Sequence, residues 1–138
     1  MISANAHEPP GDGSPDDLKG LSILLVEDSW HVGRALKILL QALGADVTGP
    51  AATPAEAERL LSEHAPDVAI VDFNLRGGER ANGLIDRLQH QRVSVIVISG
   101  YSVLPLPPVK PAVMLQKPVS EAQLLATLRP LVTQKAAR

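Results

Sequence analysis

The stretch Val68–Leu75 limits the possible folds of this chain more than any other, because four consecutive apolar residues end abruptly at Asp72. A short apolar run without alternation predicts a strand that is covered on both faces, as in a parallel sheet. The glycines Gly77 and Gly78 follow too closely for the strand to continue. Core packing does not explain a carboxylate at the end of a buried strand, so Asp72 is a candidate functional residue.

Strands and helices are predicted to alternate along the rest of the chain. The expected strands are residues 21–26, 46–51, 68–72, 93–98 and 112–116. The expected helices are residues 29–43, 54–65 and 81–90, and a last helix begins after Ser120, with Pro130 expected to end or kink it. Four prolines between residues 103 and 111 predict that the fourth helix of the series is absent or reduced. Such alternation indicates a doubly wound α/β fold, a parallel sheet with helices on both faces.

The chain is expected to form one domain, since it has 138 residues. Residues 1–20 are rich in Pro, Gly, Asp and Ser and predict a disordered leader, followed by the domain at 21–132 and a short tail at 133–138. A net charge of −2 without a basic stripe argues against nucleic-acid binding. No apolar run approaches the roughly 20 residues of a membrane helix. The lack of cysteine fits a reducing cytoplasm.

Polar side chains stand at the carboxyl ends of four predicted strands. Glu27 and Asp28 follow the first, Asp72 ends the third, Ser99 follows the fourth and Lys117 follows the fifth. In an open parallel sheet these ends meet at one edge, which is where such folds carry out chemistry. Three carboxylates held together there repel one another unless a cation joins them, and Mg²⁺ prefers oxygen ligands. A lysine and a hydroxyl beside them suit a phosphoryl group, with Asp72 as the candidate nucleophile.

These residues also carry a family resemblance. Glu27-Asp28, Asp72, Ser99-Gly100 and Lys117-Pro118, in this order and at these strand ends, resemble the receiver domain of two-component response regulators. The resemblance covers about residues 21–131, nearly all of the chain except the leader. It implies the flavodoxin-like strand order 2-1-3-4-5 for the five-stranded sheet.

The resemblance assigns a role to each of these side chains. Asp72 accepts a phosphoryl group from the phosphohistidine of a sensor histidine kinase, and the Lys117–Pro118 bond is cis. The metal site for Mg²⁺ or Mn²⁺ consists of Glu27, Asp28, Asp72 and the backbone carbonyl of Asn74. Ser99 and Lys117 bind the phosphoryl oxygens.

One departure from the usual receiver pattern concerns the switch. Ordinary receivers carry Tyr or Phe three residues before the lysine, whereas this chain has Met114, which we interpret as a core residue. An aromatic instead follows the hydroxyl directly, in Ser99-Gly100-Tyr101. This arrangement resembles the subgroup named for a Phe-Ala-Thr-Gly-Tyr-like motif, whose members are often stand-alone regulators. Ser99 and Tyr101 are therefore the switch candidates.

The predicted function is a single-domain response regulator that signals by protein contact or drains phosphate from a kinase. It assists its own phosphorylation and dephosphorylation and is not an enzyme. The expected partners are a sensor histidine kinase and an unknown downstream protein, with no nucleic acid and no membrane, and the expected state is a monomer or weak dimer.

Three alternatives stay open. A phosphatase of the haloacid dehalogenase type also uses a strand-end aspartate, but it needs a second acid where this chain has Asn74. A flavodoxin-like FMN binder needs a phosphate loop after the first strand, where Glu27 and Asp28 repel anions. A receiver-like module that binds a partner without phosphorylation is the third.

Overall fold

The computed structural model describes residues 14–73, 82–100 and 113–137. Within this part of the chain, five parallel strands form one sheet in the order β2-β1-β3-β4-β5. The strands are β1 (Ser22–Val26), β2 (Asp46–Ala51), β3 (Val68–Asp72), β4 (Ser94–Ser99) and β5 (Val113–Gln116). The helices are α2 (Trp30–Ala42), α3 (Pro54–Glu63), α4 (Asn82–His90) and α5 (Glu121–Ala136). The doubly wound fold and the strand order predicted from the sequence are confirmed.

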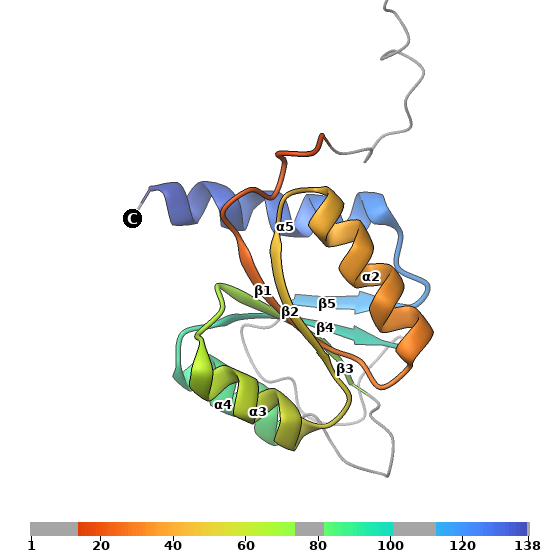
Figure 1. Ribbon diagram of the computed structural model, residues 1–138, viewed down its shortest axis with the longest axis vertical. Helices are drawn as coiled ribbons and strands as arrows, with labels where there is room; N and C mark the ends of the chain where they lie inside the picture. Colours follow the sequence, from red (N-terminus) through yellow and green to blue (C-terminus); the bar gives the residue numbers. More distant parts are fainter. Residues whose placement is uncertain (1–13, 74–81, 101–112, 138) are drawn as a thin grey trace, which may run out of the picture.

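The helices cover the sheet as two outer layers, with α2 and α5 on one face and α3 and α4 on the other (Figure 1). Each layer closes its own hydrophobic cluster against the sheet. One cluster joins Leu61 of α3 and Leu84 of α4 to inward side chains such as Val71. The other joins Leu40 of α2 and Leu125 of α5 to side chains of the opposite face. Because β1 and β3 are buried on both faces, their sequences read as continuous apolar runs.

Three helices begin where the sequence predicts. The hydroxyls of Ser29 and Thr53 accept hydrogen bonds from the backbone N–H groups of Val32 and Glu56, at 3.4 and 3.1 Å. Ser120 and Gln123 form a reciprocal capping box at the start of α5. These caps satisfy backbone donors that the first turn of a helix leaves without partners.

The prediction that Pro130 ends or kinks the last helix is wrong as to the end, because α5 continues to Ala136. Residues 133–136, expected in the tail, are helical. Leu131 and Val132 pack against the core, and Lys135 Nζ donates to Asp67 Oδ2 and to the carbonyl of Gly20, at 2.8 and 2.6 Å. These contacts hold the helical residues beyond Pro130, which itself removes one backbone hydrogen bond from the helix.

The prediction of a disordered leader is wrong for residues 14–20. Leu18 is fully buried, and its N–H donates to the carbonyl of Leu43 at 2.8 Å. Asp17 pairs with Arg129 of α5 at 2.8 Å. A single apolar side chain therefore anchors a segment whose composition alone indicates disorder. Residues 1–13 lie outside the described part of the chain.

The pairing of β2 with β1 is irregular near its end. The register pairs Leu24 with Thr48 but Val26 with Ala51, so Gly49 and Pro50 lie opposite Leu25. Gly49 has a φ of +102°, and the Gly49–Pro50 bond is cis. The expected absence or reduction of a helix between β4 and β5 concerns residues 101–112, which lie outside the described residues. None of the helices in the described ranges is long and apolar enough to cross a membrane.

Candidate functional site

The fold brings the predicted site residues to one edge of the sheet. Glu27 and Asp28 directly follow β1, Asp72 ends β3, Ser99 ends β4 and Lys117 directly follows β5. All four strands are parallel, so these ends share one edge.

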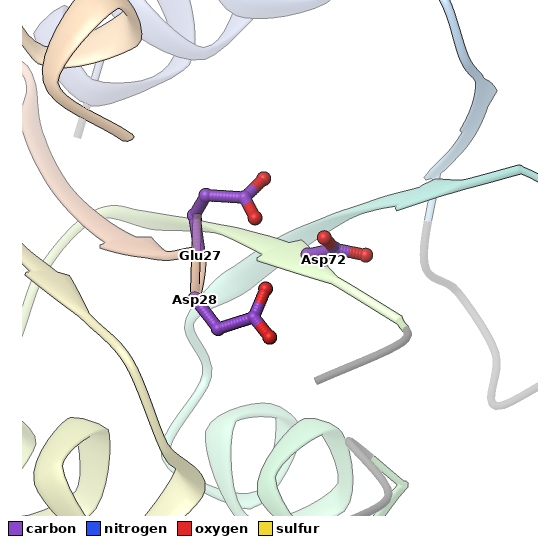
Figure 2. A group of neighbouring side chains, drawn as sticks. All are labelled: Glu27, Asp28 and Asp72. Carbon is purple, nitrogen blue, oxygen red and sulfur yellow. The ribbon is translucent and has the colours of Figure 1, made fainter. Parts of the chain in front are cut away.

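Glu27, Asp28 and Asp72 form an acidic cluster at this edge. The register pairs Val26 with Val71, so the residues that follow, Glu27 and Asp72, stand on neighbouring strands. Figure 2 shows the three side chains gathered at the ends of β1 and β3. One carboxylate oxygen from each residue lies within 4.8 Å of the other two. Glu27 and Asp72 are only 6% and 4% exposed, so their charges are held away from bulk water.

The electrostatics of the cluster favour either a proton or a metal ion. Burial, together with the adjacent Asp72 carboxylate, raises the pKa of Glu27 to about 7, although the Ser29 N–H and the Lys117 charge lower it. The cost of burying this carboxylate therefore outweighs the stabilising charge of Lys117. The three carboxylates provide oxygen ligands, which fit a hard divalent cation such as Mg²⁺.

Lys117 supplies the positive charge next to Asp72. Its Nζ donates to Asp72 Oδ2 at 3.0 Å, while its side chain remains 42% exposed. The backbone places it there, because the N–H of Lys117 donates to the carbonyl of Ser99 at 2.8 Å. The Lys117–Pro118 bond is cis, as the family resemblance implies. A cation in this place stabilises negative charge on Asp72 or on a group attached to it.

The other predicted residues differ in how far the structure places them. Ser99 is buried at the same edge, with 3% exposure. Asn74 and Tyr101 lie outside the described residues. The interpretation of Met114 as a core residue is wrong, since it is 40% exposed. Among the described residues, its strand β5 is the last in the sheet order and has a strand neighbour, β4, on one side alone.

Ser29 caps α2, and its link to the site was missed from the sequence. Its backbone N–H donates to Glu27 Oε2 at 3.1 Å. This bond ties the buried carboxylate to the first turn of α2. The signal in the sequence is position alone, because Ser29 directly follows the acidic pair.

An open groove of about 510 Å³ runs beside the acidic cluster. Glu27 and Lys117 line its polar part, and its apolar wall includes Val32 and Leu36 of α2 together with Pro118 and Val119. Val32 is 47% exposed although it is aliphatic. The site therefore opens onto a surface that can receive an apolar partner.

Comparisons with known proteins agree with this geometry. The sequence pattern of the response regulator receiver domain matches residues 23–129. The phyllosphere-induced regulator PhyR of Methylorubrum extorquens is 31% identical over 121 residues, which cover 84% of this chain and 45% of that protein. The chain thus spans less than half of this curated relative.

Two solved structures show the same fold. The response regulator PhyR from Brucella abortus superposes with a TM-score of 0.75 at 20% identity, covering 88% of this chain and 52% of that one. The receiver (REC) domain of PhyR from Erythrobacter litoralis superposes with a TM-score of 0.73 at 24% identity, covering 83% of this chain and 92% of that one. At 20% and 24% identity, the similarity to these two structures supports the fold alone.

Proposed function

This chain belongs to the response regulator receiver domain family, and on that premise we propose that it accepts a phosphoryl group on Asp72 from a sensor histidine kinase in a Mg²⁺-dependent reaction. The phosphorylated form then signals by contact with a downstream protein, or the chain acts as a phosphate sink. A cytoplasmic location and a monomeric or weakly dimeric state are parts of the same proposal.

The observation that supports the proposal most strongly is the surroundings of Asp72. This carboxylate is nearly buried, lies within a cluster of three acids and receives a hydrogen bond from Lys117 at 3.0 Å. A structural aspartate at a strand end needs one cap or one ion pair, not two further acids beside it. The arrangement is suited to hold a dianionic group between a metal ion and an ammonium group.

In the proposed reaction, a carboxylate oxygen of Asp72 attacks the phosphorus atom of the kinase phosphohistidine. An oxygen–phosphorus bond forms as the phosphorus–nitrogen bond breaks, and the imidazole leaves with the electron pair. Lys117 donates to the phosphoryl oxygens in place of Asp72 Oδ2, and Ser99 provides a hydroxyl donor. Glu27, Asp28 and the backbone carbonyl of Asn74 would hold Mg²⁺ together with Asp72, and the bound ion supplies positive charge to the phosphoryl oxygens. Water later attacks the phosphorus and releases inorganic phosphate.

The groove beside Lys117 supports the proposed kinase contact. Its apolar wall of Val32, Leu36 and Val119 leads directly to the polar end formed by Glu27 and Lys117. A partner that packs on this wall would present a phosphohistidine to Asp72. The downstream target is proposed to be a protein, with no further identity assigned.

The proposal is tested with a small phosphodonor. Incubation with acetyl phosphate and Mg²⁺ should add the mass of one phosphoryl group to the intact protein and change the fluorescence of Trp30, the single tryptophan. EDTA or Asp72→Ala should abolish both changes. Asp46→Ala, which alters an exposed aspartate at the start of β2, is the matched control and should behave as wild type.

The same assay separates the proposal from a receiver-like module that is not phosphorylated. Such a module would show no added mass with any donor in the presence of Mg²⁺. That result, obtained with folded protein, would contradict the proposal. Turnover of a generic phosphate ester would instead point to a phosphatase.

A further inference from the structure

Gly33 lies in the first turn of α2 and has no room for a side chain. A Cβ atom built on it would lie 2.9 Å from both Cβ and Cγ of Pro50, and 3.6 Å from Cγ of Glu27. Favourable contacts between carbon atoms begin at about 3.5 Å. The helix therefore approaches β2 at a separation that glycine permits and alanine does not. Glycine inside a helix weakens it, so a packing or functional reason is expected.

The bulge in β2 brings Pro50 into this contact. Gly49 and Pro50 together lie opposite Leu25, and a Cβ on Gly49 would lie 2.5 Å from the Leu25 carbonyl oxygen. Gly49 also has a φ of +102°, which favours glycine. Bulges of this kind occur beside active sites, where they redirect a side chain. Here the bulge presses the Pro50 ring against α2 at Gly33.

Glu27 is attached to both sides of this contact. Its backbone N–H donates to the carbonyl of Ala51, directly after the bulge, at 2.9 Å. Its carboxylate accepts from the N–H of Ser29, the cap of α2, at 3.1 Å. Lys37 of α2 also donates to the carbonyl of Gly49 at 2.8 Å. A change in the distance between α2 and the bulge would therefore shift the carbonyl that binds the Glu27 backbone relative to the N–H that binds its carboxylate.

We propose that Gly33 and Pro50 are positioning residues for Glu27, and that their close contact holds this carboxylate where the acidic cluster binds Mg²⁺. This inference rests on the proposed function. Neither residue touches the metal or the phosphoryl group. They act through Glu27, by fixing the separation of the two elements that hold it. Residues that orient metal ligands in this way typically change metal affinity about 10- to 100-fold when they are mutated.

The test compares Gly33→Ala with Gly83→Ala. Gly83 also lies in a helix, but a Cβ there would meet nothing within 4 Å, so it controls for the general effect of alanine on helices. Mg²⁺ titrations followed by Trp30 fluorescence, with thermal melts in EDTA to show folding, should give a dissociation constant about tenfold weaker for Gly33→Ala. Gly83→Ala should match wild type. With acetyl phosphate, the Mg²⁺ concentration for half-maximal rate should rise, while the rate at saturating Mg²⁺ stays within about twofold.

A second substitution shows whether the effect acts through Pro50. In a Pro50→Gly background, Gly33→Ala should change the Mg²⁺ affinity less than about twofold, because the clashing atoms are gone. Equal effects of Gly33→Ala in both backgrounds, or no effect in the wild-type background, would overturn the inference. If Gly33→Ala does not melt cooperatively, the comparison is made in a Pro50→Ala background. Pro50→Ala keeps the Cβ atom that lies close to residue 33, so Gly33→Ala should still weaken Mg²⁺ binding there. Unchanged affinity would contradict the inference. Failure of wild type to bind Mg²⁺ would overturn the proposed metal site itself, which is a different result.

Discussion

Lys117 and Glu27 have opposite effects on the charge around Asp72. Lys117 neutralises Asp72 directly, at 3.0 Å, whereas Glu27 adds a negative charge that burial makes costly. The site therefore holds electrostatic repulsion that a bound divalent ion would relieve.

Lys117→Gln should separate metal binding from phosphoryl transfer. Removal of an ammonium group beside the acids should tighten Mg²⁺ binding by about two- to fivefold, because one competing cation is lost. Phosphorylation by acetyl phosphate should slow by about tenfold or more, since the phosphoryl oxygens lose a charged donor. Stopped-flow Trp30 fluorescence measures both quantities. Lys19→Gln, at an exposed lysine, is the control, and a parallel loss of Mg²⁺ affinity and rate would contradict this division of roles.

Glu27→Gln should change how the stability of the metal-free protein depends on pH. Folding raises the pKa of Glu27 from 4.5 to about 7, so the folded state binds the additional proton. The stability of wild type should therefore fall as the pH rises through this range. Glu27→Gln removes this loss, and its gain over wild type at pH 8 should be at most about 3 kcal/mol and should vanish below about pH 4, where both states are protonated. Urea unfolding in EDTA measures the difference, and identical pH profiles would rule out a buried, proton-binding Glu27.

Among the secondary-structure elements, the strand ends hold the site residues, and the helix surfaces are where a partner would make contact. α2 presents Val32 toward the groove and Ile38 elsewhere on its surface, and both are exposed aliphatic residues, at 47% and 54%. The two differ mainly in whether they border the site. A substitution at each therefore tests what the groove contributes.

Val32→Asp should slow phosphotransfer from a cognate phosphorylated kinase by about tenfold, because an acid in the apolar wall opposes partner packing. The rate with acetyl phosphate should stay within about twofold, since a small donor needs no groove. Ile38→Asp should leave both rates unchanged. Equal slowing by the two variants would mean that the groove is not the contact surface.

Most of the strands and helices could be predicted from the sequence, because burial determines their residue pattern. Strands buried on both faces are continuous apolar runs, so the polar residue that ends each run marked the site edge. The extension of α5 beyond Pro130 was not predictable, because it depends on Lys135 contacting Asp67 and Gly20, which are distant in the sequence. The close contact of Gly33 with Pro50 likewise arises from packing between elements that no local pattern encodes.

At the scale of the whole molecule, the N-terminal segment is part of the folded unit. Leu18 completes the cluster beneath α2 and α5, and Asp17 and Gly20 contact α5 through Arg129 and Lys135. Composition predicted disorder there because a single apolar residue is too weak a signal among polar neighbours. The domain therefore begins before β1.

Leu18→Ala should lower the free energy of unfolding by about 2–4 kcal/mol, the usual cost of truncating a fully buried leucine. Ile38→Ala, at an exposed position, should change it by less than about 0.5 kcal/mol. Chemical denaturation at fixed Mg²⁺ measures both. A cost for Leu18→Ala as small as that of the control would show that the segment is not packed.

Direct mapping of the modified residue tests whether Asp72 carries the phosphoryl group. Protein treated with acetyl phosphate and Mg²⁺ is reduced with borohydride, which converts an acyl phosphate on aspartate to homoserine, and the peptides are sequenced by mass spectrometry. We predict homoserine at position 72, and none there when EDTA is present. Conversion of another aspartate, or an unmodified Asp72 in protein that has gained a phosphoryl group, would contradict the account.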